Sequence, residues 1–282
     1  MRALIAGAAG QLGRALQASA PAGVTVIAPA EADFDITSRD AVAAVVAAAA
    51  PDVIFNAAAY TAVDKAEGDA EAAMRINADA VGNLAATGVR LVHVSTDFVF
   101  DGSAGRPYAP DAATNPLGVY GATKLAGEIA AGPEALIVRT AWVYAARGNN
   151  FVATMLRLMR ERPELRVVAD QIGTPTHAAG LARALWALTA ADTRGIYHWT
   201  DAGACSWYDF AVAIGEEALA LELLDKAVPV LPIRTEDYPT PARRPAYSVL
   251  DKTATWAITG PARHWRAELR DCLREMADAS RP

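Results

Sequence analysis

The alternation of short apolar runs with longer, helix-compatible stretches is the feature of this sequence that most limits its fold. Apolar runs of strand length, most of them followed by a segment long enough for a helix, occur at Ala3–Ala6, Val24–Ile27, Asp52–Phe55, Leu91–Ser95, Ala135–Arg139 and Gly195–His198. Strands that are apolar throughout are typical of parallel sheets, because helices cover both faces of such sheets. The alternation therefore predicts an α/β fold with a doubly wound parallel sheet, as in Rossmann domains.

The first junction between a strand and a helix contains a glycine-rich segment, Gly7–Gly13. In a dinucleotide-binding fold, Gly7 permits a tight turn, and Gly10 lets the backbone approach a pyrophosphate. Gly13 lets the helix pack closely against the sheet. The helix that follows offers free N–H groups to phosphate at its N-terminus. This junction predicts a dinucleotide site.

The tip of the second strand does not indicate which dinucleotide binds. An acidic residue at this place contacts the ribose hydroxyls of NAD, whereas a basic one accommodates the additional phosphate of NADP. Pro29 and Ala30 occupy the tip. We interpret Asp35 and Ile36, a few residues later, as flanking the adenine. The alternative for Asp35 is that it caps the next helix.

Small and polar side chains follow the third and fourth strands, at the edge where open parallel sheets bind ligands. Asn56 and a run of alanines precede Tyr60 and Thr61, which leaves room for a flat ligand. Thr96 follows the fourth strand and has a neutral hydroxyl that can donate to a carbonyl oxygen. His93 lies inside that strand, a position that favours a core histidine over a catalyst.

Two further polar features lie on predicted helices. Tyr120 and Lys124 are four residues apart in a helix expected to begin after Asn115-Pro116, so they share one face and can point into one cleft. A nearby cation favours the phenolate and lowers the pKa of the phenol, which suits a general acid–base group. Alone, the pair is also compatible with a half-buried aromatic beside a solvated lysine. A helix expected from Asp69 to Ala86 carries Asn77 as the polar exception on its apolar face.

Composition excludes several classes of function. The chain has 282 residues, of which 53% are hydrophobic, and a formal net charge of −6. This balance provides no basic surface for nucleic acid or for an anionic membrane. Cys205 and Cys272 form neither a metal-ligand pattern nor a disulfide framework, which fits a reducing compartment. Because the sequence has no signal-peptide pattern and no apolar run of membrane-spanning length, we expect a cytoplasmic protein.

The chain changes character after residue 148. Phe151–Glu161 predicts an amphipathic helix, and proline-rich connections recur between residues 229 and 245. We therefore expect a dinucleotide-binding domain of residues 1–148 with a returning segment at about 177–215. A smaller substrate-binding cap would consist of residues 149–176 and 216–282.

Several segments together resemble the extended short-chain dehydrogenase/reductase superfamily and, within it, the dTDP-4-dehydrorhamnose reductases. They are GxxGQLG at 7–13, NAAAYTAVDKAE at 56–67, STDFVFDG at 95–102, VYGATKLAGE at 119–128, RTAWVY at 139–144, NNF at 149–151, DQIGTPT at 170–176 and YPTPARRPAYSVLD at 238–251. The resemblance covers nearly the whole chain, and the joint order of the segments is highly specific.

The resemblance implies reduction of the C4 ketone of dTDP-4-dehydro-L-rhamnose to dTDP-L-rhamnose, a precursor of cell-surface polysaccharides. NADPH is the implied cofactor, with NADH as the alternative. A catalytic trio is implied, in which Tyr120 protonates the new alkoxide, Lys124 holds the nicotinamide ribose and assists Tyr120, and Thr96 hydrogen-bonds the keto oxygen.

The resemblance also implies a set of binding residues. The cofactor contacts carried over, besides Tyr120 and Lys124, are Gly7, Gly10, Gln11, Leu12, Asp35, Ile36, Ala59, Tyr60 and Thr61. The contacts to the sugar nucleotide are Thr96, Asp97 and Trp142. We add Arg244 because a guanidinium in the cap suits a diphosphate through its bidentate geometry, the alternative being a surface cation.

Related classes define the alternatives. Sugar-nucleotide 4,6-dehydratases share the fold but typically place a glutamate after Thr-Asp, where this chain has Phe98. Some relatives dimerise through Mg²⁺ held by a glutamate after the glycine-rich turn, but here Arg14 and Ala15 follow that turn, so we expect no metal site and a monomer or weak homodimer. The alternative function is a non-catalytic NADP-binding regulatory subunit, like the relatives that bind methionine adenosyltransferase. Retention of the catalytic trio favours an enzyme.

Overall fold

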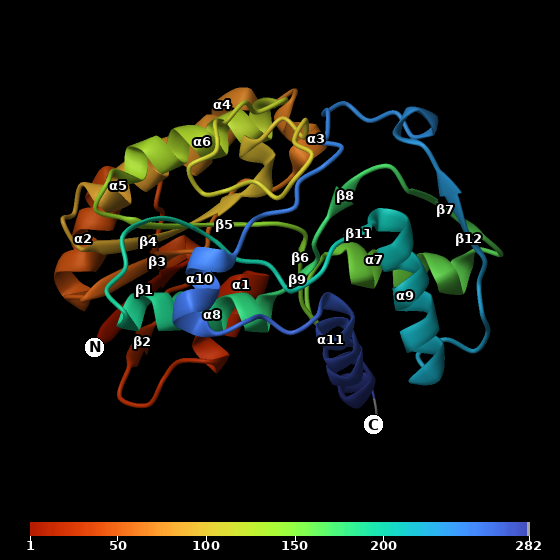
Figure 1. The fold of residues 1–282 in the computed structure, drawn as a ribbon. Coiled ribbons are helices and arrows are strands. Elements are labelled where there is room, and N and C mark those ends of the chain that lie inside the picture. Colours follow the sequence, from red (N-terminus) through yellow and green to blue (C-terminus); the bar gives the residue numbers. More distant parts are fainter. Residues whose placement is uncertain (281–282) are drawn as a thin grey trace.

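A parallel sheet lies at the centre of the computed structural model, which describes residues 1–280. Its six strands have the order β10-β5-β4-β3-β1-β2, and every neighbouring pair is parallel (Figure 1). They are β1 (Arg2–Ala6), β2 (Thr25–Ile27), β3 (Val53–Asn56), β4 (Arg90–Thr96), β5 (Leu136–Thr140) and β10 (Gly195–His198). The predicted α/β fold with a doubly wound parallel sheet is confirmed.

Helices cover both faces of this sheet (Figure 1). One face carries α1 (Gln11–Ala18), α8 (Ala178–Ala190) and α10 (Thr253–Thr259). The other carries α2 (Arg39–Ala49), α5 (Ala80–Ala85) and α6 (Val119–Ala131), with α3 (Val63–Ala66) and α4 (Ala70–Met74) packed beside α6. Within residues 1–280, no helix combines the length and the apolar character that crossing a membrane requires.

Alternating side chains of β1 explain why both faces are covered. Ala3 and Ile5 pack with α1 and α8, whereas Leu4 and Ala6 pack with the helices of the opposite face. Successive side chains of a strand point to opposite faces, so a strand that is apolar throughout needs helices on both sides. The apolar runs of the sequence therefore determine the layered architecture.

The helix expected from Asp69 to Ala86 is interrupted. A π-helical turn, Arg75–Asp79, lies between α4 and α5. Asn77 is in this turn and is buried, and its side chain reaches inward to the backbone of Tyr60 and to the hydroxyl of Thr123. Such wider turns are often found at functional sites, where they redirect a side chain.

The C-terminal part of the chain forms a second lobe, which we call the cap lobe. Its helices are α7 (Phe151–Glu161), α9 (Trp207–Ala220) and α11 (Trp265–Ser280), which share one apolar core. Its strands are the pairs β7 (Leu165–Val168) with β12 (Val230–Ile233), β6 (Val143–Tyr144) with β9 (Thr176–His177), and β8 (Ile172–Gly173) with β11 (Cys205–Ser206). The amphipathic helix predicted at Phe151–Glu161 is confirmed.

Two helices pack in the other lobe from the one that we expected from the sequence. α9 lies mostly in the segment that we assigned to the sheet domain, but its Phe210 and Ile214 belong to the core of the cap lobe. α10 lies in the segment that we assigned to the cap, but its Trp256 packs against the apolar cluster of α1 and α8. The domain boundaries remain a prediction.

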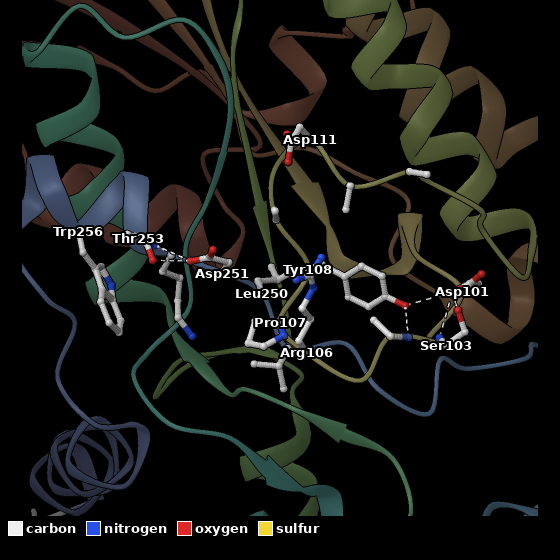
Figure 2. A pocket seen from close by; sticks show the side chains of 16 residues that line it. Asp101, Ser103, Arg106, Pro107, Tyr108, Asp111, Leu250, Asp251, Thr253 and Trp256 are labelled. Atoms are coloured by element: carbon white, nitrogen blue, oxygen red, sulfur yellow. Dashed lines mark hydrogen bonds between the residues drawn. The ribbon is translucent and has the colours of Figure 1, made fainter.

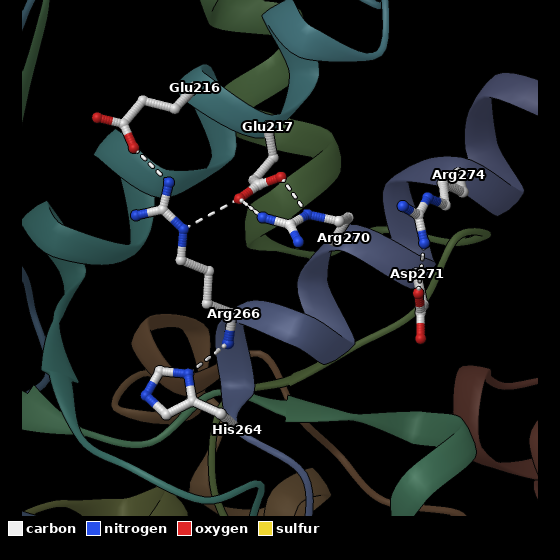
Figure 3. A network of polar contacts seen from close by, with 7 residues as sticks. All are labelled: Glu216, Glu217, His264, Arg266, Arg270, Asp271 and Arg274. Atoms are coloured by element: carbon white, nitrogen blue, oxygen red, sulfur yellow. Dashed lines mark hydrogen bonds and ion pairs between the residues drawn. The ribbon is translucent and has the colours of Figure 1, made fainter.

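Ion pairs hold α11 against α9 within the cap lobe (Figure 3). Glu217 on α9 accepts hydrogen bonds from Arg266 Nε at 3.0 Å and from Arg270 Nε at 2.7 Å. Arg266 also pairs with Glu216, and its backbone N–H donates to His264 Nδ1. Because the Glu217 carboxylate is nearly buried, these bonds fix the orientation of α11 more than exposed pairs would.

Candidate active site

The strand order reverses at β1, and this is the place where a ligand crevice is expected in an open parallel sheet. From β1 the chain goes first to β2 on one side and then to β3 on the other. The loops after β1 and β3 therefore diverge at the carboxyl edge of the sheet, which is where open α/β sheets bind ligands. The glycine-rich segment follows β1, and residues 57–61 follow β3.

The glycine-rich segment forms a cradle of bare backbone. Gly7 has φ +76°, and a Cβ there would lie 2.7 Å from the backbone nitrogen of Ala58. A Cβ on Gly13 would collide with the Gly7 carbonyl. Gly10 precedes α1 and makes no side-chain cap, so the first N–H groups of the helix are available to a ligand. This arrangement fits the pyrophosphate of a dinucleotide.

Gln11 and Leu12, also predicted to contact the cofactor, differ in environment. Leu12 is buried in the core beneath the turn, so only its backbone faces the crevice. The Gln11 side-chain oxygen accepts a hydrogen bond from Asn150 Nδ2 at 2.8 Å, and its amide nitrogen donates to the Asn149 carbonyl at 3.4 Å. Gln11 therefore ties the turn to the loop that leads into α7.

Asp35 and Ile36 follow β2. Asp35 is exposed and accepts hydrogen bonds from the Thr37 hydroxyl and N–H, which lower the pKa of its carboxyl. Ser38 caps α2 by accepting from Ala41 N–H, so the alternative that Asp35 caps this helix is wrong. Ile36 is buried in the core under α2 and α5.

The Asn77 side chain fixes the loop after β3. Its Oδ1 accepts from Tyr60 N–H at 2.9 Å, and its Nδ2 donates to the Tyr60 carbonyl at 3.2 Å and to Thr123 Oγ1 at 3.1 Å. Ala59 and Tyr60 are half-buried and Thr61 is exposed. The loop of these three predicted cofactor residues is thus tied to α6, the helix of Tyr120. The sequence marked Asn77 only as a polar exception.

The structure brings the three residues of the predicted catalytic trio together. Thr96 ends β4, and Tyr120 and Lys124 lie on the first two turns of α6, which packs against β4. The Tyr120 ring meets Phe98 edge to face at 5.4 Å, and its hydroxyl interacts with that of Thr96. Thr96 is buried and Lys124 is 2% exposed. The predicted constellation therefore exists at the carboxyl edge of the sheet.

Burial dominates the proton affinities of the trio. It raises the pKa of Tyr120 to about 12, with the Thr96 hydrogen bond opposing and the Asp97 charge adding to the rise. Burial lowers the pKa of Lys124 to about 8, against the attraction of Glu128. Lys124 Nζ donates to the Val94 carbonyl at 2.7 Å. The structure thus differs from the expected pairing of an ammonium with the phenol, because the amine is held toward the sheet.

Asp97 completes the polar surface beside Thr96. It is 1% exposed, its Oδ1 accepts from Thr96 Oγ1 at 3.0 Å, and burial raises its pKa to about 6. The Ser248 hydroxyl lies beside this carboxyl and opposes the rise of its pKa, but no described residue makes a hydrogen bond to Oδ2. Buried carboxyl oxygens normally have a partner, so this oxygen is available to a ligand.

A buried ion pair that the sequence analysis missed supports α6 from behind. Glu128 accepts from Arg139 Nε at 2.8 Å and Nη2 at 2.7 Å, and Ser95 also donates to Glu128. Both charged side chains are less than one-twentieth exposed. The available signal was a glutamate on a mostly apolar helix and an arginine inside an apolar strand, since such charges are buried only when paired.

Trp142 has an unusual backbone and a stacked side chain. Its φ is +49°, a region that bulky residues rarely adopt. The indole stacks on Trp207 of α9 at 3.5 Å with an interplanar angle of 11°, and a Cβ on Gly173 would lie 2.7 Å from it. Backbone strain held by such packing is characteristic of functional positions. Trp207 was not predicted, because it reads as an ordinary helix residue.

Comparison with known proteins assigns the chain to a family. The family model described as RmlD substrate binding domain matches residues 1–278. The chain belongs to the RmlD family. A dTDP-4-dehydrorhamnose reductase of Burkholderia thailandensis is 43% identical over 98% of this chain and 99% of its own length.

Solved structures of RmlD-family proteins agree with this assignment. The dTDP-4-dehydrorhamnose reductase of Clostridium acetobutylicum has a TM-score of 0.91 and 42% identity, covering 98% of this chain and 99% of that one. The Bacillus anthracis enzyme, in complex with NADP, has a TM-score of 0.89 and 37% identity, covering 97% of this chain and 99% of that one.

Arg244 of this RmlD-family chain is already paired. Its guanidinium forms a bidentate pair with Asp64 at 3.0 and 2.7 Å and also donates to Thr240 Oγ1 at 2.6 Å. The side chain is 24% exposed. Binding of a diphosphate by Arg244 would therefore require its guanidinium to give up at least one of its two hydrogen bonds to Asp64.

A cavity of about 940 Å³ lies apart from the trio (Figure 2). It is formed by residues 101–113 and 249–256, and Tyr108 in its wall donates a hydrogen bond to Asp101 Oδ1 at 3.0 Å. No member of the catalytic trio lines it. Cavity size alone therefore does not locate the catalytic edge of this RmlD-family chain.

Proposed function

We propose that this chain catalyses the NADPH-dependent reduction of the C4 ketone of dTDP-4-dehydro-L-rhamnose, which yields dTDP-L-rhamnose. The observation that carries the proposal is the position of the trio at the same sheet edge as the glycine cradle. A ketone held between these features would meet a hydride donor on one side and a phenol on the other. Relatives that are 43% identical over nearly the whole chain are named for this activity.

The residues around the crevice fit NADPH. The turn of Gly7, Gly10 and Gly13 would hold the pyrophosphate through backbone N–H groups, since side chains at two of these positions would collide with the backbone. The loop at Ala59–Thr61 would line the nicotinamide half, and the exposed Asp35 would lie at the adenine half. A relative of 37% identity binds NADP. When bound, the cofactor supplies the hydride to C4.

The trio of this chain would manage the oxygen and its proton. The Thr96 hydroxyl would turn its one proton from Asp97 Oδ1 to the keto oxygen and stabilise the charge that develops there. The Tyr120 phenol, which keeps its proton at neutral pH, would transfer it to the new alkoxide. Lys124 would hold the nicotinamide ribose and stabilise the phenolate left on Tyr120.

The sugar nucleotide would lie between the sheet edge and the cap lobe. The Trp142 indole, fixed by Trp207, offers a flat apolar surface for a hexose ring. Asp97 Oδ2, which lacks a protein partner among residues 1–280, is suited to a sugar hydroxyl. Arg244 would reach a diphosphate by exchanging one of its bonds to Asp64.

Cellular location and assembly are part of this proposal. Both cysteines are free and buried, which suits a reducing compartment such as the cytoplasm. We propose a monomer or weak homodimer that acts on a dTDP-sugar without nucleic acid or membrane as a partner.

Turnover tests the proposal. Purified protein mixed with dTDP-4-dehydrorhamnose and NADPH is expected to consume the cofactor and form one dTDP-rhamnose per NADPH. The same mixture with NADH measures cofactor preference. Tight NADPH binding without turnover with either cofactor would contradict the proposal and favour the non-catalytic regulatory subunit.

A further inference from the structure

Two buried polar side chains of the sheet are linked to Lys124. Asn56 at the end of β3 is in register with His93 on β4, and they are 1% and 0% exposed. Asn56 Nδ2 lies 3.1 Å from His93 Nδ1, and His93 Nε2 lies 3.4 Å from Lys124 Nζ. A continuous polar chain thus runs from β3 through β4 to the lysine of the trio.

The orientation of the Asn56 amide is fixed. Its Oδ1 accepts a hydrogen bond from the Ala58 N–H at 3.2 Å, so its Nδ2 faces the imidazole. An amide nitrogen can only donate, and His93 Nδ1 must therefore accept. Burial is the main cause that lowers the pKa of His93 well below its usual value, so the ring is neutral and carries its proton on Nε2.

The proton on His93 Nε2 has a consequence for Lys124. An ammonium has three donors and no acceptor, so it would meet the ring N–H donor to donor. The uncharged amine has a lone pair that accepts from His93 while an amine N–H donates to the Val94 carbonyl at 2.7 Å. The contact with His93 therefore favours the uncharged amine.

The other charged groups around Lys124 act differently. Glu128 on α6 favours the ammonium, but its oxygens are occupied by Arg139 of β5 and by Ser95. Tyr120 shares the face of α6 with Lys124. The charge of Asp97, which follows β4, raises the pKa of Tyr120. Among the described contacts of Nζ, the ring of His93 and the Val94 carbonyl are the partners.

We propose that Asn56 and His93 are positioning residues for Lys124. Asn56 fixes the tautomer of His93, and the Nε2–H of His93 disfavours the ammonium form of Lys124, so that it helps burial to lower the pKa of this side chain while Nζ is held against β4. The effect on turnover rests on the proposed role of Lys124 in ketone reduction, whereas the tautomer is a property of the protein by itself.

Nitrogen NMR of the full chain with ¹⁵N-labelled histidine tests the first step without substrate. The chain has four histidines, and the signals of His93 are those lost in His93→Phe. We expect a neutral ring protonated on Nε2 between about pH 6 and pH 9. A ring protonated on Nδ1, or a charged ring in this range, would overturn the inference whether or not the protein reduces the proposed ketone.

Asn56→Asp tests the coupling to Lys124. A carboxylate accepts where the amide donated, so the proton of His93 is expected to move to Nδ1 and Nε2 to accept from the Lys124 ammonium. If the alkaline limb of the kcat profile reports Lys124, we expect it near pH 8 in the unmodified chain and about one to two pH units higher in Asn56→Asp, the size of one hydrogen bond to a charged group.

Asn56→Asp in the His93→Phe background separates a shift that His93 transmits from a direct effect of the added negative charge on Lys124. If the ring transmits the change, Asn56→Asp no longer moves the alkaline limb in that background. An equal shift in both backgrounds would mean a direct charge effect and would overturn the role of His93. If His93→Phe does not fold, an unchanged tautomer in Asn56→Asp alone overturns it.

Discussion

At the scale of single residues, the Tyr120 phenol and the Asp97 carboxyl keep their protons to higher pH than they would in water. Burial is the main cause for both, and it places their pKa values at about 12 and about 6. A protonated phenol is the form that can donate to an alkoxide. The chemistry of the site therefore depends on the apolar surroundings as much as on the residue types.

Asp97 makes folding dependent on pH. Between its ordinary pKa of 3.8 and its folded value of about 6, the folded protein keeps a proton that the unfolded chain releases. The free energy of unfolding therefore falls as pH rises through this window, by about 3 kcal/mol, and this contribution is constant above it. Asp97→Asn removes the ionisation, so the variant is expected to gain stability relative to the unmodified chain between about pH 4 and pH 7.

Urea unfolding of both proteins at the two ends of this pH range measures the effect. The difference between the variant and the unmodified chain at low pH serves as the internal control, because both side chains are then neutral. A stability difference that does not change with pH would contradict the raised pKa of Asp97.

At the scale of helices and strands, the buried pair of Glu128 and Arg139 joins α6 to β5. Glu128→Gln leaves the Arg139 guanidinium buried without a countercharge, so the free energy of unfolding is expected to fall by about 3–5 kcal/mol. Glu161→Gln removes an exposed partner of Arg157 on α7 and is the matched control, with an expected loss below about 1 kcal/mol. Equal losses in urea unfolding would contradict the structural role of the buried pair.

The glycine-rich segment sets the distance between α1 and the sheet. In Gly13→Ala the new methyl group would collide with the Gly7 carbonyl, so α1 is expected to shift and the affinity for NADPH to fall at least about tenfold. Gly105→Ala, where a Cβ meets nothing within 4 Å, is the control. Titration followed by NADPH fluorescence measures both, and unchanged affinity in Gly13→Ala would remove the cradle from the cofactor site.

The regular elements were predictable because each depends on its own sequence. The apolar runs located the strands of the parallel sheet, and the apolar periodicity of Phe151–Glu161 gave α7. The π turn at Arg75–Asp79 depends on contacts of Asn77 with Tyr60 and Thr123, which lie far away along the chain. The lobe to which α9 or α10 belongs was not predictable, since an apolar face does not specify its partner.

In the candidate site, too, some features were predictable from the sequence and others were not. Strand ends and helical spacing made Thr96, Tyr120 and Lys124 candidates, and the family resemblance implied that they act as a trio. The position of the Lys124 amine was not predictable, because it depends on His93 and Val94 of a neighbouring strand. Pair contacts across a sheet leave no periodic signal in a single sequence.

At the scale of the whole molecule, the cap lobe supplies one wall of the proposed substrate site. Trp142 is held there by Trp207, and Trp142→Ala is expected to raise the KM for the sugar nucleotide about tenfold or more, by removing a stacking surface worth roughly 1–3 kcal/mol. The affinity for NADPH is expected to stay unchanged and serves as the control. Steady-state kinetics that show an unchanged KM would place Trp142 in the core instead.

Reduction of a ketone between the two lobes, with Tyr120 as the proton donor, is the function that we propose for the whole molecule. The most direct measurement compares NADPH oxidation by the unmodified chain and by Tyr120→Phe, with dTDP-4-dehydrorhamnose as substrate and NADPH binding measured in parallel. Removing the hydroxyl while keeping the ring is expected to lower turnover by roughly 100- to 10,000-fold with little change in NADPH affinity. Near-normal turnover by Tyr120→Phe would contradict the account.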